Sequence, residues 1–482
     1  MSLARKVFSG TAQLTFSNGL VRLLSIATMP FLTAMLSPDV YGLTNLVGTV
    51  VSLISVVVLM GLDMSYARAY FSSQPPNGIT VEHYCWRLAF GVTIPIAVLC
   101  SVAWWYGSQK FIELNQQLSP FIALGIIASV ANTMASTRAR LAANYRAMSW
   151  SIVLSGFLCS GISIAIALWW RKDVLALLIP MVLSYLLPVL ILGTPSLISL
   201  LKSSLLSTTQ KVALVNIGLA GVITAPMYWL LSSSDRWFLQ YFHGANLVGI
   251  YSIGYNVAMI GMMINNAVTS VWLPEATREF EADHQRAQVT LGRLMSRLIV
   301  IMGCIWLAVT AAGGDIVHWL ANERFYGAVD VIPYVAGAVF FNGVLQLANA
   351  GLLLKKKLKW ALFWWLGGGG ISIILNLFLI PEFNSLGAAL TQVLSFGFIA
   401  LGILFSSQVF FPLRMNWGHL IVTMVIIILA GIVMMPAWNA VPTISLLMKV
   451  PAGMVVVLIV MLIIANDWVK SGIRYLARRV GY

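Results

Sequence analysis

The chain is a series of apolar runs of about 20 residues, separated by short polar segments. A helix of that length crosses the roughly 30 Å hydrocarbon core of a bilayer. Backbone groups in lipid find no water, so these runs must form helices, whose hydrogen bonds are internal. The short alternating segments of a membrane β-barrel are not seen in them. The pattern predicts an all-α polytopic membrane protein of about 14 transmembrane helices.

The boundaries of the expected spans follow from the apolar runs. They are 12–36, 40–62, 84–106, 119–141, 150–170, 174–200, 212–234, 246–272, 293–313, 328–353, 360–381, 385–407, 417–438 and 447–468. The longest loops, after the second and eighth spans, have about 20 residues. We therefore expect no soluble domain and place the function among the helices. The first apolar run is too long for the apolar region of a signal peptide and is interrupted by Asn18 and Arg22, so we expect no cleavable signal peptide.

Composition and charge fit this class. Hydrophobic residues make up 60% of the 482 residues and charged residues 9%, against roughly 25% charged in soluble domains. The net charge of +14 comes from scattered residues, which indicate membrane orientation and give no reason to expect nucleic acid. Most Lys and Arg fall on the side of the termini, with Arg171 and Lys172 as exceptions. We predict that both termini lie in the cytoplasm.

Weak self-similarity predicts an internal repeat. SPDVYGLTNLVG (37–48) aligns with GANLVGIYSIGY (244–255) through Gly42 and Gly249, 207 residues apart. Two further pairs of segments match. The members of one pair end at Trp150 and Trp360, 210 residues apart, and those of the other begin at 182 and 393, 211 residues apart. Six helices return the chain to its starting side, so the two copies are parallel. We expect two six-helix bundles around a central cavity, with two additional helices. The predicted divisions are 1–205, 206–410 and 411–482.

The first span carries one polar face around a mid-span arginine. Polar residues recur there at helical spacing, namely Thr11, Thr15, Asn18, Arg22, Ser25 and Thr33. A charge at mid-membrane costs at least about 2.5 kcal/mol, so Arg22 must face a hydrated cavity or a buried partner. Guanidinium binds phosphate oxygens in a planar fork. The span predicts a site for an anionic, phosphorylated substrate, and Pro30 should bend it.

Other spans carry polar stripes that also suit a hydrated lumen. We select Thr133 in the fourth span, Asn256 and Asn266 in the eighth, and Gln346 in the tenth. Such residues also serve as interhelical hydrogen-bonding groups. The glycines at 367–370 indicate close helix packing or a flexible break, since no phosphate-loop Lys follows them.

Charges near helix ends form a second group of candidates. Asp63 and Arg68 follow the second span, and Asp235 and Arg236 follow the seventh. Asp63 and Asp235 are possible coupling or ion-pair groups, and ordinary interfacial pairs are the alternative for both sets. The four cysteines lack metal-site spacing, so we expect core packing, no metal and no cofactor.

At these residues the chain resembles bacterial O-antigen and polysaccharide flippases of the Wzx type, in the multidrug/oligosaccharidyl-lipid/polysaccharide (MOP) exporter superfamily. The matching segments are LSPDVYG (36–42), GLDMSYARAYF (61–71), SDRWFLQYFHGANLVGIYSIGYNVA (234–258) and SLGAALTQVLSF (385–396). The resemblance implies 14 helices and alternating access, in some cases coupled to H+ or Na+. It implies an undecaprenyl-pyrophosphate-linked oligosaccharide, a repeat unit of O-antigen, lipopolysaccharide or a related polysaccharide, moved from the cytoplasmic to the periplasmic leaflet.

The resemblance also implies roles for individual residues. Arg22 matches the cavity arginine of the first helix, Asp235 and Arg236 the charged pair of the seventh, and Arg68 the arginine after the second. We also assign Arg140 and Arg297 to the cationic cavity. This assignment rests only on the helix face on which their positions in the sequence place them. Possible partners are a polysaccharide polymerase and a chain-length regulator.

Three alternatives remain open. A drug or cation antiporter of the MATE type would carry acidic residues deep in the membrane, whereas the deep charge here is basic. A glycan polymerase, ligase or other glycosyltransferase would need a large outer loop with catalytic carboxylates or His. A scaffold for other enzymes gives no reason for Arg22. No ATPase motif is present, so we expect a transporter and no enzyme. The sugars, coupling ion and oligomeric state stay open.

Overall fold

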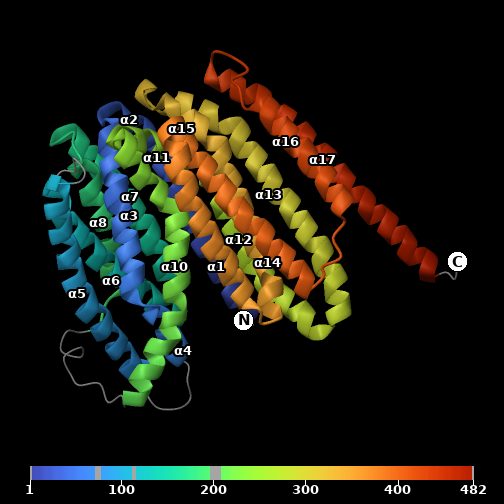
Figure 1. The fold of residues 1–482 in the computed structure, drawn as a ribbon, viewed down its shortest axis with the longest axis horizontal. Helices are drawn as coiled ribbons and strands as arrows, with labels where there is room; N and C mark the ends of the chain where they lie inside the picture. Colours follow the sequence, from blue (N-terminus) through green and yellow to red (C-terminus); the bar gives the residue numbers. More distant parts are fainter. Residues whose placement is uncertain (1–2, 71–77, 111–115, 196–207, 480–482) are drawn as a thin grey trace. The chain divides into compact units, whose positions relative to one another are not determined.

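The computed structural model describes residues 3–70, 78–110, 116–195 and 208–479, which form helices and connecting turns (Figure 1). The elements are α1 (Leu3–Ala27), α2 (Met29–Met35), α3 (Pro38–Leu59), α4 (Leu62–Tyr70), α5 (Gly78–Lys110), η1 (Gln116–Leu118), α6 (Ser119–Leu141), α7 (Tyr145–Trp169), α8 (Leu175–Leu192), α10 (Thr208–His243), α11 (Ala245–Ala258), α12 (Ile260–Ala282), α13 (His284–Leu320), η2 (Glu323–Val331), α14 (Ile332–Leu354), α15 (Leu358–Phe410), α16 (Trp417–Met434) and α17 (Pro442–Arg479).

The predicted all-α polytopic fold is confirmed. Within the described residues, 10 helices are long and apolar enough to cross a membrane, or up to 12 if each bent pair is one span. α15 counts once in that number, yet its 53 residues cover two predicted spans, divided at Asn384, where φ is 53°. α10 covers another predicted span. The expected figure of about 14 is thus approximate. The predicted runs lie on helices over most of their described lengths, and residues 196–200 of the sixth run lie outside the described residues.

The first span is bent where proline predicts it. Gln13–Ala27 and Met29–Met35 meet at 40° around Thr28, two residues before Pro30. Proline lacks the backbone N–H and cannot continue the helical hydrogen-bond ladder. The predicted bend is therefore confirmed.

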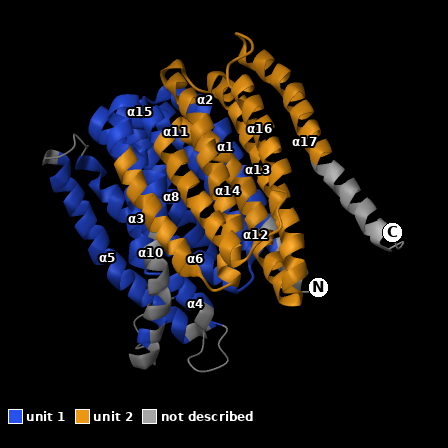
Figure 2. Ribbon diagram, turned by 45° about the vertical axis from the view of Figure 1, so that its right-hand side comes forward, with its two compact units in different colours: residues 1–252, 376–388 blue, residues 253–375, 389–482 orange. Residues whose placement is uncertain are grey.

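Contacts divide the chain into two compact units (Figure 2). The first contains residues 1–252 and 376–388, and the second contains 253–375 and 389–482. These boundaries follow spatial contacts and do not test the repeat-based divisions at 205 and 410, which stay a prediction.

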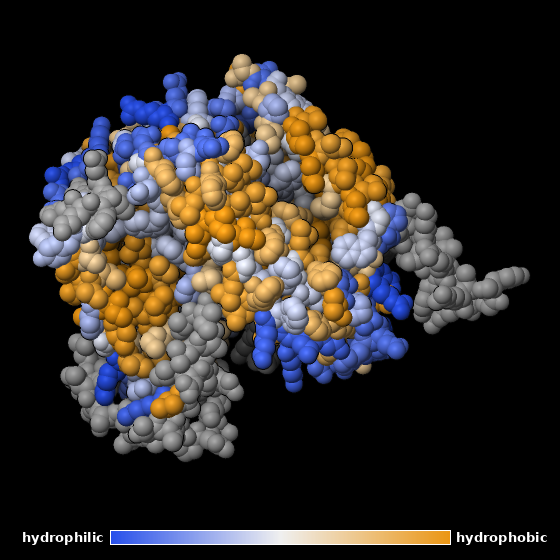
Figure 3. All heavy atoms as spheres, in the orientation of Figure 1, coloured by the Kyte–Doolittle hydropathy of each residue, from blue (hydrophilic) through white to orange (hydrophobic). Residues whose placement is uncertain are grey.

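Each unit buries large side chains among its own helices and leaves apolar ones on the outside. In the first unit, Tyr66, Trp86 and Met134 come from α4, α5 and α6 and share one core cluster. In the second, α16 and α17 expose Ile432, Leu447 and other apolar side chains. Figure 3 shows hydrophobic side chains over the sides of helices and hydrophilic ones near helix ends. This distribution suits lipid contact along the helices.

The turn before α13 is fixed by a capping carboxylate. Asp283 accepts hydrogen bonds from the backbone N–H groups of Arg286 at 3.1 Å and Gln285 at 2.9 Å. These bonds stabilise the ionised carboxylate and lower the pKa of Asp283. Asp283 thus sets the point at which α13 begins.

The four-glycine run packs closely and does not break α15. α15 is helical through 367–370. A Cβ on Gly368 would lie 2.3 Å from the side chain of Ile399, and one on Gly402 would lie 2.2 Å from Trp364. The two arms of α15 therefore approach closely at glycine, the first of the two expected explanations.

We predict opposite effects for two substitutions within this run. Gly370→Ala should stabilise the protein by about 0.5–1 kcal/mol, because a Cβ there meets no atom within 4 Å and alanine favours the helix. Gly368→Ala should destabilise it by about 1–3 kcal/mol, because the arms must separate. Thermal unfolding of the purified protein measures both. Equal effects of the two variants would contradict the packing explanation.

Candidate functional site

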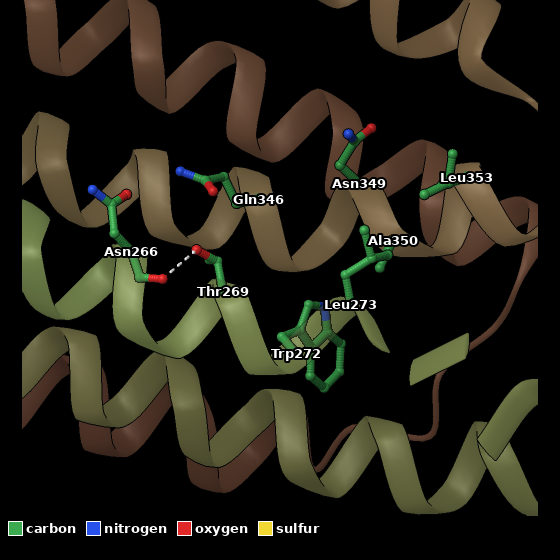
Figure 4. Close-up of a pocket in the computed structure, with 8 residues that line it drawn as sticks. All are labelled: Asn266, Thr269, Trp272, Leu273, Gln346, Asn349, Ala350 and Leu353. Carbon is green, nitrogen blue, oxygen red and sulfur yellow. Dashed lines mark hydrogen bonds between the residues drawn. The ribbon is translucent and has the colours of Figure 1, made fainter. Parts of the chain in front are cut away.

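A polar pocket lies between α12 and α14, within the second unit (Figure 4). Its volume is about 310 Å³. The lining residues are Asn266, Thr269, Trp272, Leu273, Gln346, Asn349, Ala350 and Leu353. Four of these side chains are polar and none is charged. An uncharged polar pocket is unusual inside helices that are otherwise apolar, because a polar group facing lipid is costly.

Helical spacing brings the polar residues together. On α12, Asn266 and Thr269 are three residues apart, and on α14 Gln346 and Asn349 have the same spacing, so each pair shares a helix face. Figure 4 shows Asn266 and Gln346 on the two neighbouring helices. Two residues expected to line a lumen, Asn266 and Gln346, thus border one pocket.

Hydrogen bonds separate pocket groups from groups that join the helices. Asn265 is buried, and its Nδ2 donates to the carbonyl oxygen of Val339 at 2.6 Å. Its neighbour Asn266 is exposed and lines the pocket. Asn349 Oδ1 is buried without a hydrogen-bond partner among the described residues. Asn265 therefore joins α12 to α14, whereas Asn266 and Asn349 retain hydrogen-bonding capacity.

The remaining pocket side chains are held in place. Gln346 Nε2 donates to Asn342 Oδ1 at 2.7 Å, and Trp272 Nε1 donates to the Leu347 carbonyl oxygen at 3.0 Å. The Thr269 hydroxyl donates to carbonyl oxygens of its own helix, at 3.3 Å for Asn266 (Figure 4). The pocket is therefore a built polar surface, suited to ligands with hydroxyl or amide groups.

The predicted residues of α1 lie along one helix of the first unit. Arg22 is half-buried, and its backbone carbonyl oxygen accepts a hydrogen bond from the Ser25 hydroxyl at 2.7 Å. Asn18 is exposed, and its Nδ2 donates to the Leu14 carbonyl oxygen at 2.8 Å. Their roles in a lumen stay predictions.

The other predicted residues occupy different environments. Asp63 of α4, Thr133 of α6 and Arg297 of α13 are half-buried, whereas Arg140 of α6 and Asn256 of α11 are exposed. The Thr133 hydroxyl bonds to the Ser129 carbonyl oxygen of its own helix at 3.0 Å. The side chain of Arg68 lies outside the described residues. Of the predicted site residues whose side chains the structure describes, Asn266 and Gln346 are the two that line the α12–α14 pocket together.

Asp235 and Arg236 form a dry charged cluster on α10. They are 2% and 4% exposed, and Arg236 Nη1 lies 3.6 Å from Asp235 Oδ1. Tyr251 donates its hydroxyl hydrogen to Asp235 Oδ2, and its ring lies 5.7 Å from the guanidinium carbon. The guanidinium also donates to the Ser232 carbonyl oxygen at 2.8 Å. In this conformation both charges are enclosed by protein, so a substrate role for Arg236 remains a prediction.

Two ion pairs that join different helices of the described chain were not selected from the sequence. Lys449 Nζ of α17 donates to Asp315 Oδ2 of α13 at 2.7 Å, with both side chains 2% exposed. Arg138 Nε of α6 lies 2.9 Å from Glu82 Oε1 of α5. Lys449 could have been selected from the sequence, because it is a single charge within an apolar run, as Arg22 is. Nothing in the spacing reveals that Arg138, rather than Arg140, reaches a carboxylate.

The repeat-related glycines contact one another within the first unit. A Cβ on Gly42 would lie 1.9 Å from the Ala245 carbonyl oxygen, and one on Gly249 would lie 1.8 Å from that of Pro38. Asn246 Nδ2 donates to Asp39 Oδ2 at 3.1 Å, and these residues are also 207 apart. Such reciprocal contacts are those of a local two-fold axis. We call Pro38, Asp39, Gly42, Ala245, Asn246 and Gly249 the two-fold seam.

Comparisons with known proteins now decide the family. A family model described as polysaccharide biosynthesis protein matches residues 7–280. The chain belongs to the polysaccharide biosynthesis protein family. This confirms the predicted resemblance at the level of the family. No curated protein matches the chain in sequence.

Solved structures show the fold of this family member. A lipid II flippase MurJ, in an inward closed conformation, has a TM-score of 0.67 at 11% identity, covering 95% of this chain and 99% of that one. An inward-facing MATE multidrug transporter has a TM-score of 0.53 at 13% sequence identity, and the match covers 81% of this chain and 97% of that one. A MOP superfamily transporter from Pyrococcus furiosus has a TM-score of 0.50 at 10% sequence identity, and the match covers 83% of this chain and 95% of that one. The chain thus shares its fold with these MurJ, MATE and MOP-superfamily structures.

For this polysaccharide biosynthesis protein we predict that the Lys449–Asp315 pair fixes α17 on α13. Lys449→Met should lower the free energy of unfolding by about 3–5 kcal/mol, because it leaves a buried carboxylate unpaired. Adding Asp315→Asn should restore much of the loss. The exposed Lys359→Met is the control, with a change within about 0.5 kcal/mol. Thermal unfolding in detergent measures all four proteins, and a double variant as unstable as Lys449→Met would contradict the assignment.

Proposed function

We propose that this protein is a flippase for an undecaprenyl-pyrophosphate-linked oligosaccharide, such as an O-antigen or related lipopolysaccharide repeat unit. It would move this lipid from the cytoplasmic to the periplasmic leaflet of a bacterial inner membrane, with both termini in the cytoplasm. The observation that carries the proposal is the uncharged polar pocket between apolar helices in a member of a polysaccharide biosynthesis family. The MOP fold, shared with a lipid II flippase, supports it.

The pyrophosphate requires cationic groups on its route. Arg22 is our principal candidate, because a guanidinium remains charged and donates to two phosphate oxygens at once. Arg68, Arg140, Arg236 and Arg297 stay secondary candidates, and Asp63 and Asp235 stay candidates for coupling. Neither H+ nor Na+ is favoured as the coupling ion, and no cofactor is proposed.

The prenyl tail would remain among apolar surfaces. A groove of about 430 Å³ lies between α13, α16 and α17. It is lined almost entirely by apolar side chains such as Leu307, Met434 and Val457, with Lys449 as the one charged lining residue. These helices include the two predicted beyond the repeat, and the groove supports a role for them in guiding the tail.

The buried carboxylates argue against cation export. Among the described residues, the buried acidic side chains are Glu82, Asp235 and Asp315. Each lies beside Arg or Lys, at 2.9, 3.6 and 2.7 Å respectively. A cationic substrate would need a carboxylate that lacks such a partner. This pairing favours the anionic lipid over the cationic drug as substrate.

Alternating access would operate through the two-fold seam. The seam lies at the start of α3 and of α11, which the positive-inside rule assigns to the periplasmic side. Backbones that approach through glycine form a close seal without long side chains. We propose that the seam is shut while substrate enters from the cytoplasm and parts when substrate leaves.

We predict that Arg22→Ala reduces glycan export at least about tenfold, since a charge-assisted hydrogen bond to phosphate is lost. Arg22→Lys should retain part of the activity, because lysine keeps the charge and loses the fork. Leu23→Ala, at a 63% exposed position of the same helix, is the control. Surface polysaccharide is measured in cells with equal amounts of each protein. Normal polysaccharide with Arg22→Ala would remove Arg22 from the mechanism.

We also predict that locking the seam stops transport. Asp39→Cys and Asn246→Cys are introduced together after Cys85, Cys100, Cys159 and Cys304 are replaced by alanine. Oxidative cross-linking should abolish export, and reduction should restore it, because the seam must part in each cycle. The two single-cysteine variants should remain active under oxidation. Full export by the cross-linked protein would mean that the seam is a permanent joint.

A further inference from the structure

The α12–α14 pocket can be assigned to one part of the substrate. We propose that it binds an uncharged sugar residue of the lipid-linked oligosaccharide, at a site separate from the one that binds pyrophosphate. This inference rests on the proposed function and deepens it. The pocket's location, chemistry and size each support it.

The location suits a substrate that arrives from the cytoplasm. The pocket ends at Leu353, two residues before the basic turn that begins at Lys355. The positive-inside rule places that turn in the cytoplasm. The pocket then lies in the cytoplasmic half of the membrane, where a polar ligand would leave water before crossing.

The chemistry suits neutral hydroxyl groups. Amide side chains both donate and accept hydrogen bonds, as sugar hydroxyls do. Asn266 is exposed to the pocket, and Asn349 Oδ1 is buried without a partner among the described residues. The Asn349 side chain lines the pocket, and a rotation of its amide would bring Oδ1 to a sugar hydroxyl and give that acceptor a partner. Trp272 and Leu273 add apolar surface against which a sugar ring can pack.

The charge and size of the pocket restrict its ligand. No charged side chain is among its eight lining residues, so phosphate gains no ionic partner there. An acidic sugar would likewise have its charge desolvated without compensation. The volume of about 310 Å³ is at the small end of ligand pockets, roughly 300–1,000 Å³. It suits a small portion of the glycan, and we assign it to a neutral hexose or N-acetylhexosamine.

The test compares two lipids in proteoliposomes. One is undecaprenyl pyrophosphate bearing a single N-acetylhexosamine, and the other is sugar-free undecaprenyl pyrophosphate. Asn266→Ala and Asn349→Leu should each weaken binding of the sugar-bearing lipid by about 3- to 10-fold, while binding of the sugar-free lipid stays unchanged. Asn349→Leu keeps the branched shape of the side chain and removes an unsatisfied buried acceptor, so the variant should fold. Thr277→Ala, an exposed residue of α12 outside the pocket, is the control.

The outcomes separate this inference from the proposed function. If the wild type moves the sugar-bearing lipid across the bilayer and the variants bind both lipids normally, the pocket assignment is overturned and the flippase stands. Equal weakening for both lipids also overturns it, because the residues would then act on fold or pyrophosphate. If the wild type binds and moves neither lipid, the proposed function itself fails.

Discussion

A polar group within a membrane must find its hydrogen-bond partner inside the protein or face water. That constraint makes every segment that crosses lipid helical, and it also separates the polar side chains by role. Asn265 and Lys449 have partners across helix interfaces, at 2.6 and 2.7 Å, and act as structural contacts. Asn266 and Asn349 face a cavity. The difference between satisfied and available polar groups, more than polarity itself, is why we propose the α12–α14 pocket as a substrate site.

The same constraint explains why glycine appears where helices meet. Within lipid no hydrophobic force drives helix association, so helices gain most from close packing and short hydrogen bonds. α15 uses Gly368 and Gly402 in this way, and the two-fold seam uses Gly42 and Gly249. The first contact joins two arms of one element, whereas the second joins residues that the predicted repeat aligns with each other. A symmetric contact has equal partners on both sides, which suits a joint that opens and closes.

The sequence predicts features that depend on local periodicity. The apolar runs lie on helices over most of their described lengths, α6 has the expected bounds of 119 and 141, and Pro30 accompanies a bend of 40°. The two polar stripes, with Asn266 on α12 and Gln346 on α14, also follow from helical spacing. Features that depend on a distant partner could not be derived. The alignment paired Gly42 with Gly249 without indicating that they touch. Arg140 was selected by helical phase, whereas Arg138, two residues away, reaches Glu82.

The central claim is that the protein moves a completed lipid-linked oligosaccharide between leaflets. Its most direct test removes the protein from its host and determines which lipid intermediates accumulate, and on which side of the inner membrane. The account predicts fully assembled repeat units on undecaprenyl pyrophosphate, protected from periplasmic reagents because they stay in the cytoplasmic leaflet. Intermediates that are incomplete, or complete and accessible from the periplasm, would contradict it and would indicate an earlier biosynthetic step or a later polymerisation step.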